Sequence, residues 1–570
     1  MKSFFVAGPL FIITLFFTQL GFNSGGSQAS TDSPDITLCS SALNTIVPDK
    51  NGKYIPLLPG WGNLNYKIST QKDSAQFYFN QGLSFYYGYH FTESLASFKE
   101  ASRMDPSSAM SYWGQALSMG PFYNTYVYKM KKEVPEAIAA MIQASSTATE
   151  KEKDLISALQ KRYSNDLTNT DRKQLDRNYA TSLASLIRKY PTDNDIKALY
   201  IDAVMLEHKW DFWSHDGTPR PWTSELITLA EEVLKTSQHP AILHYYIHLT
   251  EASRQPSRAL FAADVLKDNL PGIPHMVHMS SHMYQRNGLY AKGVGVNDDA
   301  SSMSNQLDDR APGLNIGKDK SIHYYAVQSY CAMTAGMYEK GIRIYDRARN
   351  RQIALTPAFE QETYAQFVYM MPLMARVRLG KWEEIRQSPK PSEKWKYALV
   401  LDRFAKGLAL IHNKDLKAAK ESLRELNEAM KDSLLAVRLL PFNSPLQSCR
   451  IASGILAGEI LFAEGKFEES VGAFKSAITE EDKMVYREPQ DWLIPARQYL
   501  GAYLLKMNKA DEAEIVYTED LMMNPGNGWS LLGMYQSLEA QKKSIEATDY
   551  KSKYLKAFEA ADVKPFASVF

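Results

Sequence analysis

Small and aromatic residues recur along this chain at fixed spacings that are typical of paired helices. Within residues 76–106, successive members of the set are separated by 3, 9, 4, 3 and 5 positions: Gly82, Phe85, Ser94, Phe98, Ala101 and Pro106. Small residues let two antiparallel helices approach closely, and a proline ends the second helix because it has no backbone N–H to donate. The spacing therefore predicts a helix–turn–helix unit, which has to stack on similar units to bury its apolar face.

Three further segments repeat these intervals: Gly458, Leu461, Ser470, Phe474 and Ala477; Gly501, Leu504, Ala513, Tyr517 and Pro525; and Thr250, Ala259, Ala263, Leu266 and Pro271. Weaker copies lie at the Gly-x-aromatic turns 336–338 and 380–382. The spacing resembles the consensus of the tetratricopeptide (TPR) repeat, a helix pair of about 34 residues. An ordinary helical bundle with coincidental spacing is the alternative, and four matches argue against it. We expect an all-α fold, a TPR-like α-solenoid of antiparallel helix pairs.

Length, charge and cysteine content exclude several other classes of protein. At 570 residues the chain is too long for one compact core. Its 65 Lys and Arg residues balance 64 Asp and Glu residues, which argues against a nucleic-acid-binding or membrane-surface protein. Only three cysteines occur: Cys39, Cys331 and Cys449. They exclude a disulfide framework, disfavour a thiolate metal site and leave room for one disulfide.

The N-terminal segment has the order of a secretion signal. Lys2 precedes an apolar run over residues 4–20, and small polar residues follow it over 21–30. This order predicts a Sec signal peptide over residues 1–29, with cleavage near Ala29 and a soluble periplasmic or secreted protein. The alternative is a retained membrane anchor, for which the apolar run is short.

The chain beyond the signal divides into four segments. Residues 30–72 contain several prolines and glycines and no helical period, so we expect an extended N-terminal arm. A first TPR-like array with a His-lined groove is expected over residues 73–300, and a second TPR-like array over 318–570. Between the two arrays, the polar residues 301–317 predict an inserted loop.

Histidines cluster in and just beyond the first array. Six of the 11 lie between residues 244 and 323: His244, His248, His275, His278, His282 and His323. His244 and His248, and likewise His278 and His282, have i, i+4 spacing, which places both side chains of a pair on one helix face. The two pairs are 34 residues apart, the length of one repeat, so they occupy equivalent positions in consecutive helix pairs.

Other polar residues fall at related positions of the repeat. Across the expected loop the frame shifts by 48 residues, which makes His323 equivalent to His275. Glu251 lies one turn beyond the first pair, and Asp202 falls one repeat upstream at the position equivalent to His282. In TPR proteins this face of the first helix lines the concave groove, so the resemblance implies groove-facing imidazoles.

This pattern predicts a transition-metal site. Imidazoles on neighbouring helices can converge on one ion at about 2.0–2.1 Å per nitrogen. We therefore expect both i, i+4 pairs to form one shared site, with His275 and His323 as further ligands. Glu251 and Asp202 are expected to support the ligands or to act as a base for a metal-bound water. Nitrogen ligands with nearby carboxylates suit copper, zinc or iron. Two interpretations without metal stay open: satisfied structural histidines, and a polar groove that binds an acidic peptide.

No complete catalytic signature accompanies the histidines. The sequence lacks a Gly-rich phosphate loop, a Gly-x-Ser-x-Gly elbow, a His-Glu-x-x-His motif and a Cys-x-x-Cys pair. Near the C-terminus, residues 488–492 and 524–529 are rich in turn formers and tryptophan, and they predict turns between repeats. The alternative is that Glu488 and Trp492 face the groove.

Four segments resemble a group of exported bacterial TPR proteins that is defined by its sequence pattern: YHFTESLASFKEASRMDPSSAMSYWGQALSMGP, HPAILHYYIHLTEAS, PHMVHMSSHMYQRNGLY and NPGNGWSLLGM. The resemblance covers most of the chain from about residue 75. It implies the fold and the groove histidines, and it supplies no substrate. The third repeat of that group often has two histidines, whereas here His323 is followed by Tyr324 and Tyr325.

Together these observations predict an exported TPR solenoid that binds a small molecule or peptide in its groove, together with a transition metal. One alternative is a metal-dependent enzyme, a hydrolase or an oxidoreductase, that uses the same groove. The other is a metal-free scaffold that binds peptides or a protein partner. No nucleic-acid partner is expected.

Overall fold

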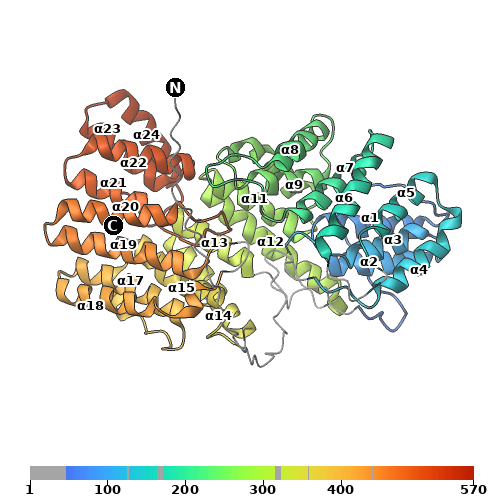
Figure 1. The fold of residues 1–570 in the computed structure, drawn as a ribbon, viewed down its shortest axis with the longest axis horizontal. Coiled ribbons are helices and arrows are strands. Elements are labelled where there is room, and N and C mark those ends of the chain that lie inside the picture. The colour runs from blue at the N-terminus through green and yellow to red at the C-terminus, as the bar shows by residue number, and fades with distance from the viewer. Residues whose placement is uncertain are drawn as a thin grey trace, which may run out of the picture. The chain divides into compact units, whose positions relative to one another are not determined.

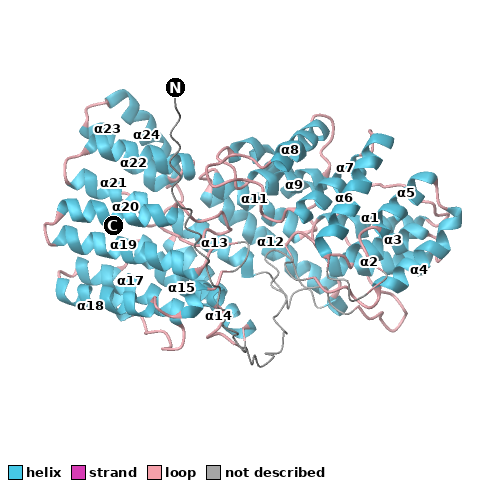
Figure 2. Ribbon diagram, viewed as in Figure 1, coloured by secondary structure: helices cyan, strands magenta, loops and turns pink. Residues whose placement is uncertain are grey.

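The described part of the chain is built from helices. The computed structural model describes residues 46–570, apart from 125–127, 165, 167–170, 315–321, 357 and 439–441. Within this part there are 24 α-helices and no strand (Figure 2), and one isolated β-bridge joins Trp213 to Pro219.

The first twelve helices are α1 (Asp73–Tyr87), α2 (Phe91–Met104), α3 (Ala109–Ser118), α4 (Val134–Ala144), α5 (Glu150–Gln160), α6 (Arg172–Lys189), α7 (Asn194–Glu207), α8 (Pro221–Leu234), α9 (Pro240–Thr250), α10 (Leu260–Asn269), α11 (Pro274–Arg286) and α12 (Tyr290–Arg310). The other twelve are α13 (Ile322–Thr334), α14 (Tyr338–Leu355), α15 (Thr363–Arg378), α16 (Trp382–Gln387), α17 (Lys396–His412), α18 (Leu416–Ala429), α19 (Pro445–Ala463), α20 (Phe467–Glu481), α21 (Ala496–Lys506), α22 (Ala510–Met523), α23 (Gly528–Ala540) and α24 (Ser544–Ala557). Short 3-10 helices cover Ser145–Thr147, Pro256–Ala259, Pro312–Leu314 and Ser433–Ala436.

Consecutive helices pack against one another along the chain. α1 contacts α2, α11 contacts α12, and α19 contacts α20, and each pair continues into the next, as α2 does with α3 and α20 with α21. Figure 1 shows these elements as neighbours, with α17 to α24 stacked side by side. This is the arrangement of a helical solenoid, in which each unit is stabilised by its neighbours.

The aromatic residue of the first repeat fills space that glycines leave open. The ring of Phe98 on α2 lies between Gly82 on α1 and Gly114 on α3. A Cβ atom on these glycines would lie 3.0 and 2.3 Å from that ring. Ser94 donates a hydrogen bond of 2.7 Å to the carbonyl oxygen of Gly82. The residues at the predicted spacing thus hold the two helices of one pair together and pack the pair against the helix that follows.

The same contacts recur in the second array. Ser470 donates to the carbonyl oxygen of Gly458 at 2.7 Å, as its counterpart does in the first repeat. The ring of Tyr517 lies against Gly501 and Gly533, where an added Cβ would approach it to 2.4 and 2.1 Å. The equivalence of these contacts confirms the predicted all-α fold, a TPR-like solenoid of antiparallel helix pairs.

Residues 46–72 lie along the first helices and form neither helix nor strand. The backbone N–H of Leu58 donates to the Gln81 side chain at 2.7 Å. The N–H of Tyr54 donates to the carboxylate of Glu100 at 3.0 Å. Side chains of α1 and α2 therefore provide the acceptors that this extended segment lacks within itself.

One expected boundary is wrong. Residues 301–310 were expected to begin a loop, and they continue helix α12 instead. Ala300, Ser304 and Leu307 are buried at helical spacing, so packing on one face outweighs the polar composition of the segment. Residues 315–317 of the expected loop lie outside the described part of the chain.

The two described cysteines are not bonded to each other. Cys331 and Cys449 are buried free thiols, and burial raises the pKa of each above its usual range. Cys39 and the expected signal segment, residues 1–29, lie outside the described residues.

One described helix, α19, has the length and apolar composition needed to cross a membrane. Half of its apolar stretch is buried within the fold, where it contacts α17, α18 and α20. Packing in the second array accounts for its composition.

We predict opposite effects of adding one methyl group at two helical glycines. Gly533→Ala places a Cβ within 2.1 Å of the Tyr517 ring and should lower the free energy of unfolding by about 1–3 kcal/mol. Gly472→Ala meets nothing within 4 Å and should raise it by about 0.5–1 kcal/mol, because alanine favours the helix. Thermal unfolding followed by circular dichroism measures both. Equal stability of the two variants would contradict the packing described here.

Candidate metal centre

Three helices carry the clustered histidines. α9 and α11 begin at Pro240 and Pro274, which suit the first helical position because the N–H that proline lacks would have no intrahelical partner there. Each of these helices presents one i, i+4 histidine pair on the same face. His275 and His323 lie at the second residue of α11 and α13. α11 contacts both α9 and α13, so all six rings meet around it.

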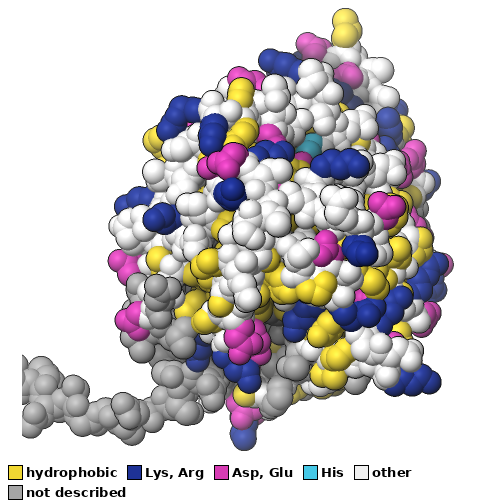
Figure 3. Space-filling model, turned by 90° about the vertical axis from the view of Figure 1, so that its right-hand side faces the viewer, with side chains coloured by type: hydrophobic (Ala, Val, Ile, Leu, Met, Phe, Trp, Pro, Cys, Tyr) yellow, Lys and Arg dark blue, Asp and Glu magenta, His cyan; other side chains and the backbone are white. Residues whose placement is uncertain are grey.

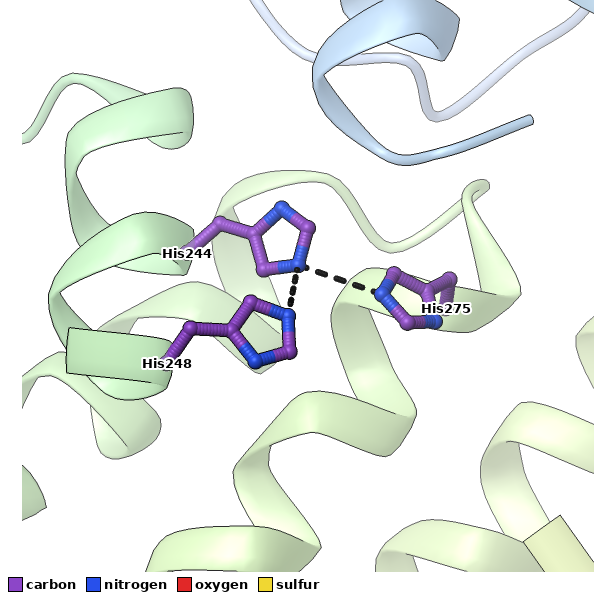
Figure 4. Close-up of side chains that lie close together, drawn as sticks. All are labelled: His244, His248 and His275. Carbon is purple, nitrogen blue, oxygen red and sulfur yellow. Dashed lines mark hydrogen bonds between the residues drawn. The ribbon is translucent and has the colours of Figure 1, made fainter. Parts of the chain in front are cut away.

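Two histidine triads result. The first triad consists of His244 and His248 from α9 and His275 from α11. The Nε2 atom of His244 lies 3.1 Å from the Nε2 atoms of both His248 and His275 (Figure 4). One nitrogen from each ring lies within 4.8 Å of the other two, close enough to hold one ion.

The second triad repeats the first, one helix pair further along. It consists of His278 and His282 from α11 and His323 from α13. The Nε2 atom of His282 lies 3.0 Å from that of His278 and 3.3 Å from that of His323. These three rings also bring one nitrogen each within 4.8 Å of the others.

The opposite ring nitrogens hold the protons. Nδ1 of His244 contacts the carbonyl oxygen of Tyr87 at 2.7 Å. Nδ1 of His278 contacts Oδ1 of Asn297 at 2.6 Å, and the amide of Asn297 is oriented by its own donation to Gly293. A carbonyl oxygen can only accept, so each Nδ1 carries a proton and each Nε2 presents a lone pair to its triad.

Glu251 joins the two triads. Nδ1 of His248 donates to Oε1 of Glu251 at 3.1 Å, and Nδ1 of His282 donates to Oε2 of the same carboxylate at 2.9 Å. His282 also contacts the carboxylate of Glu488, which accepts a hydrogen bond from the hydroxyl of Tyr486. Carboxylates on the outer nitrogens fix the ring orientations, as partners of metal-binding histidines commonly do.

In the first triad, the protonation of Glu251 decides what lies between the rings. If Glu251 accepts from His248 as a carboxylate, no hydrogen lies between the Nε2 atoms of His244 and His248, which are 3.1 Å apart. Burial and the nearby Glu488 raise the pKa of Glu251, and a protonated Glu251 would leave the proton of His248 on Nε2, where it can donate to His244. A second proton on either ring would also supply a hydrogen there, but burial lowers the pKa of His244 to about 3 and that of His248 well below its usual range. Burial therefore disfavours a second proton on either ring.

The second triad differs in its charge. Burial alone would lower the pKa of His282, but the carboxylates of Glu488 and Glu251 outweigh it and raise that pKa to about 10. In the absence of an ion, His282 therefore carries a second proton and can donate through Nε2 to His278. A metal ion at this triad would replace that proton.

The nitrogen separations suit direct coordination. Imidazole nitrogens bind zinc at about 2.0–2.1 Å, and two tetrahedral ligands at that distance lie about 3.3 Å apart. Two of the three separations in each triad, at 3.0–3.3 Å, fall close to this value, and the third is within 4.8 Å. Three ligands in each triad leave a fourth position for water or another ligand, as in catalytic rather than closed structural sites.

All six predicted histidines come together, but their nitrogens group into two triads and not into the expected set of two i, i+4 pairs. The third ring of each triad comes from the first turn of the next inner helix. A residue at that position lies closer to the i, i+4 pair than the neighbouring i, i+4 pair does. The repeat offsets in the sequence already relate the two triads, because they map the set His244, His248 and His275 onto the second triad. Asp202 is also placed elsewhere, since it accepts from Tyr86 at 2.7 Å and belongs to neither triad.

The histidines do not lie on an open groove. All six are buried, with at most 4% of a residue exposed. The aromatic ring of Tyr89 packs on His244 and His275, and Tyr324 stacks on His278 at 4.0 Å. His248, although buried, borders a cavity of about 600 Å³ together with Glu251.

Glu488 is a site residue that the turn interpretation of residues 488–492 overlooked. It lies on the loop after α20 and reaches His282 across more than 200 positions of sequence, so no local pattern reveals it. Trp492, its suggested companion, packs on Phe404 in the core of the second array and also borders the cavity.

Comparison with known proteins yields distant similarities only. No protein-family model matches the chain, and no curated protein matches it. Among solved structures, the APC/C hetero-tetramer Cut9-Hcn1 is 12% identical, with 86% of this chain and 74% of that chain covered, at a TM-score of 0.28. A human IFIT1 dimer with m7Gppp-AAAA is 10% identical, with coverage of 87% and 92% and a TM-score of 0.26. Yeast Tom70 is 11% identical, with coverage of 85% and 90% and a TM-score of 0.27. At these TM-scores the likenesses carry no argument about the site.

Arg286 should be a strong contributor to the stability of this region. Its guanidinium donates to three carbonyl oxygens, of Glu251 at 2.8 Å, Met523 at 3.0 Å and Ser253 at 3.1 Å. Arg286→Met leaves these acceptors without a donor and should lower the free energy of unfolding by about 3 kcal/mol or more.

Arg254→Met is the matched control for this measurement. Arg254 donates one bond of 3.3 Å to the carbonyl oxygen of His215, so its replacement should cost less than about 1 kcal/mol. Urea unfolding of both variants decides the matter, and equal losses would show that the carbonyl contacts of Arg286 contribute little.

Proposed function

We propose that this protein binds two transition-metal ions, one in each histidine triad. The observation that carries the proposal is the meeting of Nε2 atoms at about 3 Å in a fully buried pair that forms a triad with His275. Burial disfavours a proton there, and a divalent ion would satisfy every lone pair at once.

Copper, zinc and iron are the ions that suit these ligands. Imidazole nitrogen binds all three, and no thiolate is present to select a softer ion. Glu251 and Glu488 would hold the ring orientations of the ligands from outside, and their negative charge would help to balance the ions.

A metal-dependent enzyme is the second candidate, and the cavity favours it. The first triad reaches this cavity through His248, and three protein ligands leave a position at which a metal-bound water or substrate can react. Hydrolysis and redox chemistry are both compatible with three imidazoles. If the protein retains no ion, we would infer instead a scaffold that binds peptides without metal.

The proposed location is outside the cytoplasm. The order of positive, apolar and small residues in segment 1–29 supports secretion followed by cleavage near Ala29. Nucleic acid is not a proposed partner, because the basic and acidic residues are nearly equal in number and are interspersed on the face shown in Figure 3.

Metal content tests the two-site proposal. Untagged protein loaded with zinc or copper and freed of excess ion should retain about two equivalents, because each triad offers a complete set of three ligands. His244→Asn and His278→Asn should each remove about one equivalent. Elemental analysis measures this directly, with circular dichroism to verify that each variant is folded.

His412→Asn is the matched control. His412 stacks on Trp382 at 4.0 Å and belongs to neither triad, so this variant should keep both ions. Retention of less than about 0.1 equivalents by the unmodified protein would refute metal binding. Loss of all metal from either triad variant alone would replace two sites by one shared site.

Export is tested by the N-terminus of the mature protein. Expression with the complete leader in a bacterial host should yield soluble periplasmic protein that begins near Ser30, because a signal peptidase removes residues 1–29. Mass spectrometry of the purified protein gives this end. Intact residues 1–20 in a membrane pellet would establish the retained anchor instead.

A further inference from the structure

The cavity beside the first triad lies between segments of the two arrays. One wall comes from residues 210–220 and from the turn Glu251–Arg254. The facing wall comes from 481–492 and from the loop around Phe442. Its volume of about 600 Å³ is that of a pocket for a small organic molecule.

The floor of the cavity is continuous with the metal centre. His248 and Glu251 border it, and so does Tyr486, whose hydroxyl donates to Glu488. The guanidinium of Arg286 lies over the Tyr486 ring at 5.2 Å from its centroid. A molecule in the cavity would therefore lie close to His248, whose ring is covered by Tyr123 and Trp210.

Most charges in the cavity wall are neutralised by partners. Three arginines are paired with carboxylates: Arg220 with Asp211, Arg487 with Asp491, and Arg497 with Asp482. The carboxyl of Glu481 is buried, which raises its pKa to about 8, so it is mainly uncharged at neutral pH. Asp520 accepts hydrogen bonds from the side chains of Gln498 and Asn524.

The other three arginines of the wall are Arg254, Arg286 and Arg438, and Arg438 donates to the carbonyl oxygen of Phe442. Among the described residues, no carboxylate lies within ion-pair distance of Arg254 or Arg286, and both donate to carbonyl oxygens. Arg254 is held over the turn at Gly217, where φ is +86° and an added Cβ would lie 2.7 Å from the arginine Cδ. The glycine thus leaves the space that lets the guanidinium stem pack at the cavity wall.

Trp210 adds an aromatic surface and a third donor. It has a left-handed backbone, with φ of +59°, and its ring stacks on Tyr123 at 5.1 Å. Its indole Nε1–H is buried and has no hydrogen-bond partner among the described residues. Buried donors are nearly always satisfied, so this N–H is available to donate to an acceptor on a bound molecule. Trp213 and Phe212 extend the same aromatic wall.

We propose that the cavity binds a small aromatic organic anion, whose carboxylate or phosphate group pairs with Arg254 and Arg286 and whose ring lies on the wall formed by Trp210. This deepens the metal proposal by naming the class of molecule that reaches the first triad. The arginines provide charge-assisted donors for the anionic group, and the tryptophan provides both ring contact and an N–H.

Isothermal titration with three probes of similar ring size tests this inference. Benzoate and phenyl phosphate are the two anionic probes, and benzylamine is the cationic control. At least one anion should bind the unmodified protein with about tenfold or greater preference over benzylamine, because the unpaired guanidiniums favour negative charge. The stronger of the two anions identifies the carboxylate or the phosphate as the preferred group.

Variants distinguish specific recognition of the anion from nonspecific binding. Arg254→Met should weaken anion binding about tenfold, and Trp210→Phe, which keeps a ring and loses the N–H, about threefold. Arg258→Met is the control, since Arg258 pairs with Glu231 outside the cavity and its loss should leave affinity unchanged. Equal affinity of benzylamine and both anions, or unchanged affinity in Arg254→Met, would overturn the inference.

A chelator-treated sample distinguishes the two proposals. Arg254-dependent anion binding that persists without metal supports the cavity inference even if the triads retain no ion. Two retained metal equivalents with no anion preference would leave the metal proposal standing and refute the cavity inference.

Discussion

The buried lone pairs of the imidazoles are the constraint on which the centre of this structure depends. Carbonyl and carboxylate acceptors fix protons on the outer nitrogens, and the inner nitrogens of His244 and His248 then meet at 3.1 Å. A cation between the rings would satisfy both nitrogens, which is the physical basis of the proposed metal site.

The repeat architecture explains why there are two triads. Stacked helix pairs repeat the same local geometry, so a histidine pattern that suits one interface recurs at the next. Glu251 lies where the two copies meet and accepts from one ring of each. The duplication is not exact, because Glu488 from the second array approaches only the second triad and gives His282 a raised pKa. The two sites therefore differ in charge while sharing ligand type.

Sequence periodicity was sufficient to predict the fold and the clustering of the histidines, since both depend on local spacing. Gly82 and Phe98, or Gly501 and Tyr517, are residues whose separation alone predicts that they meet. The grouping into triads required knowing which helix approaches which, and the contact of Glu488 is set by tertiary packing that leaves no mark in nearby sequence. Composition misled at residues 301–310, where buried apolar positions keep a polar segment helical.

Anomalous X-ray diffraction from crystals of metal-loaded protein tests the central claim most directly. The account predicts two ions, each within about 2.0–2.1 Å of three imidazole Nε2 atoms, one at His244, His248 and His275 and the other at the second triad. Absence of an ion from both triads, or one ion shared by the two i, i+4 pairs, would contradict it.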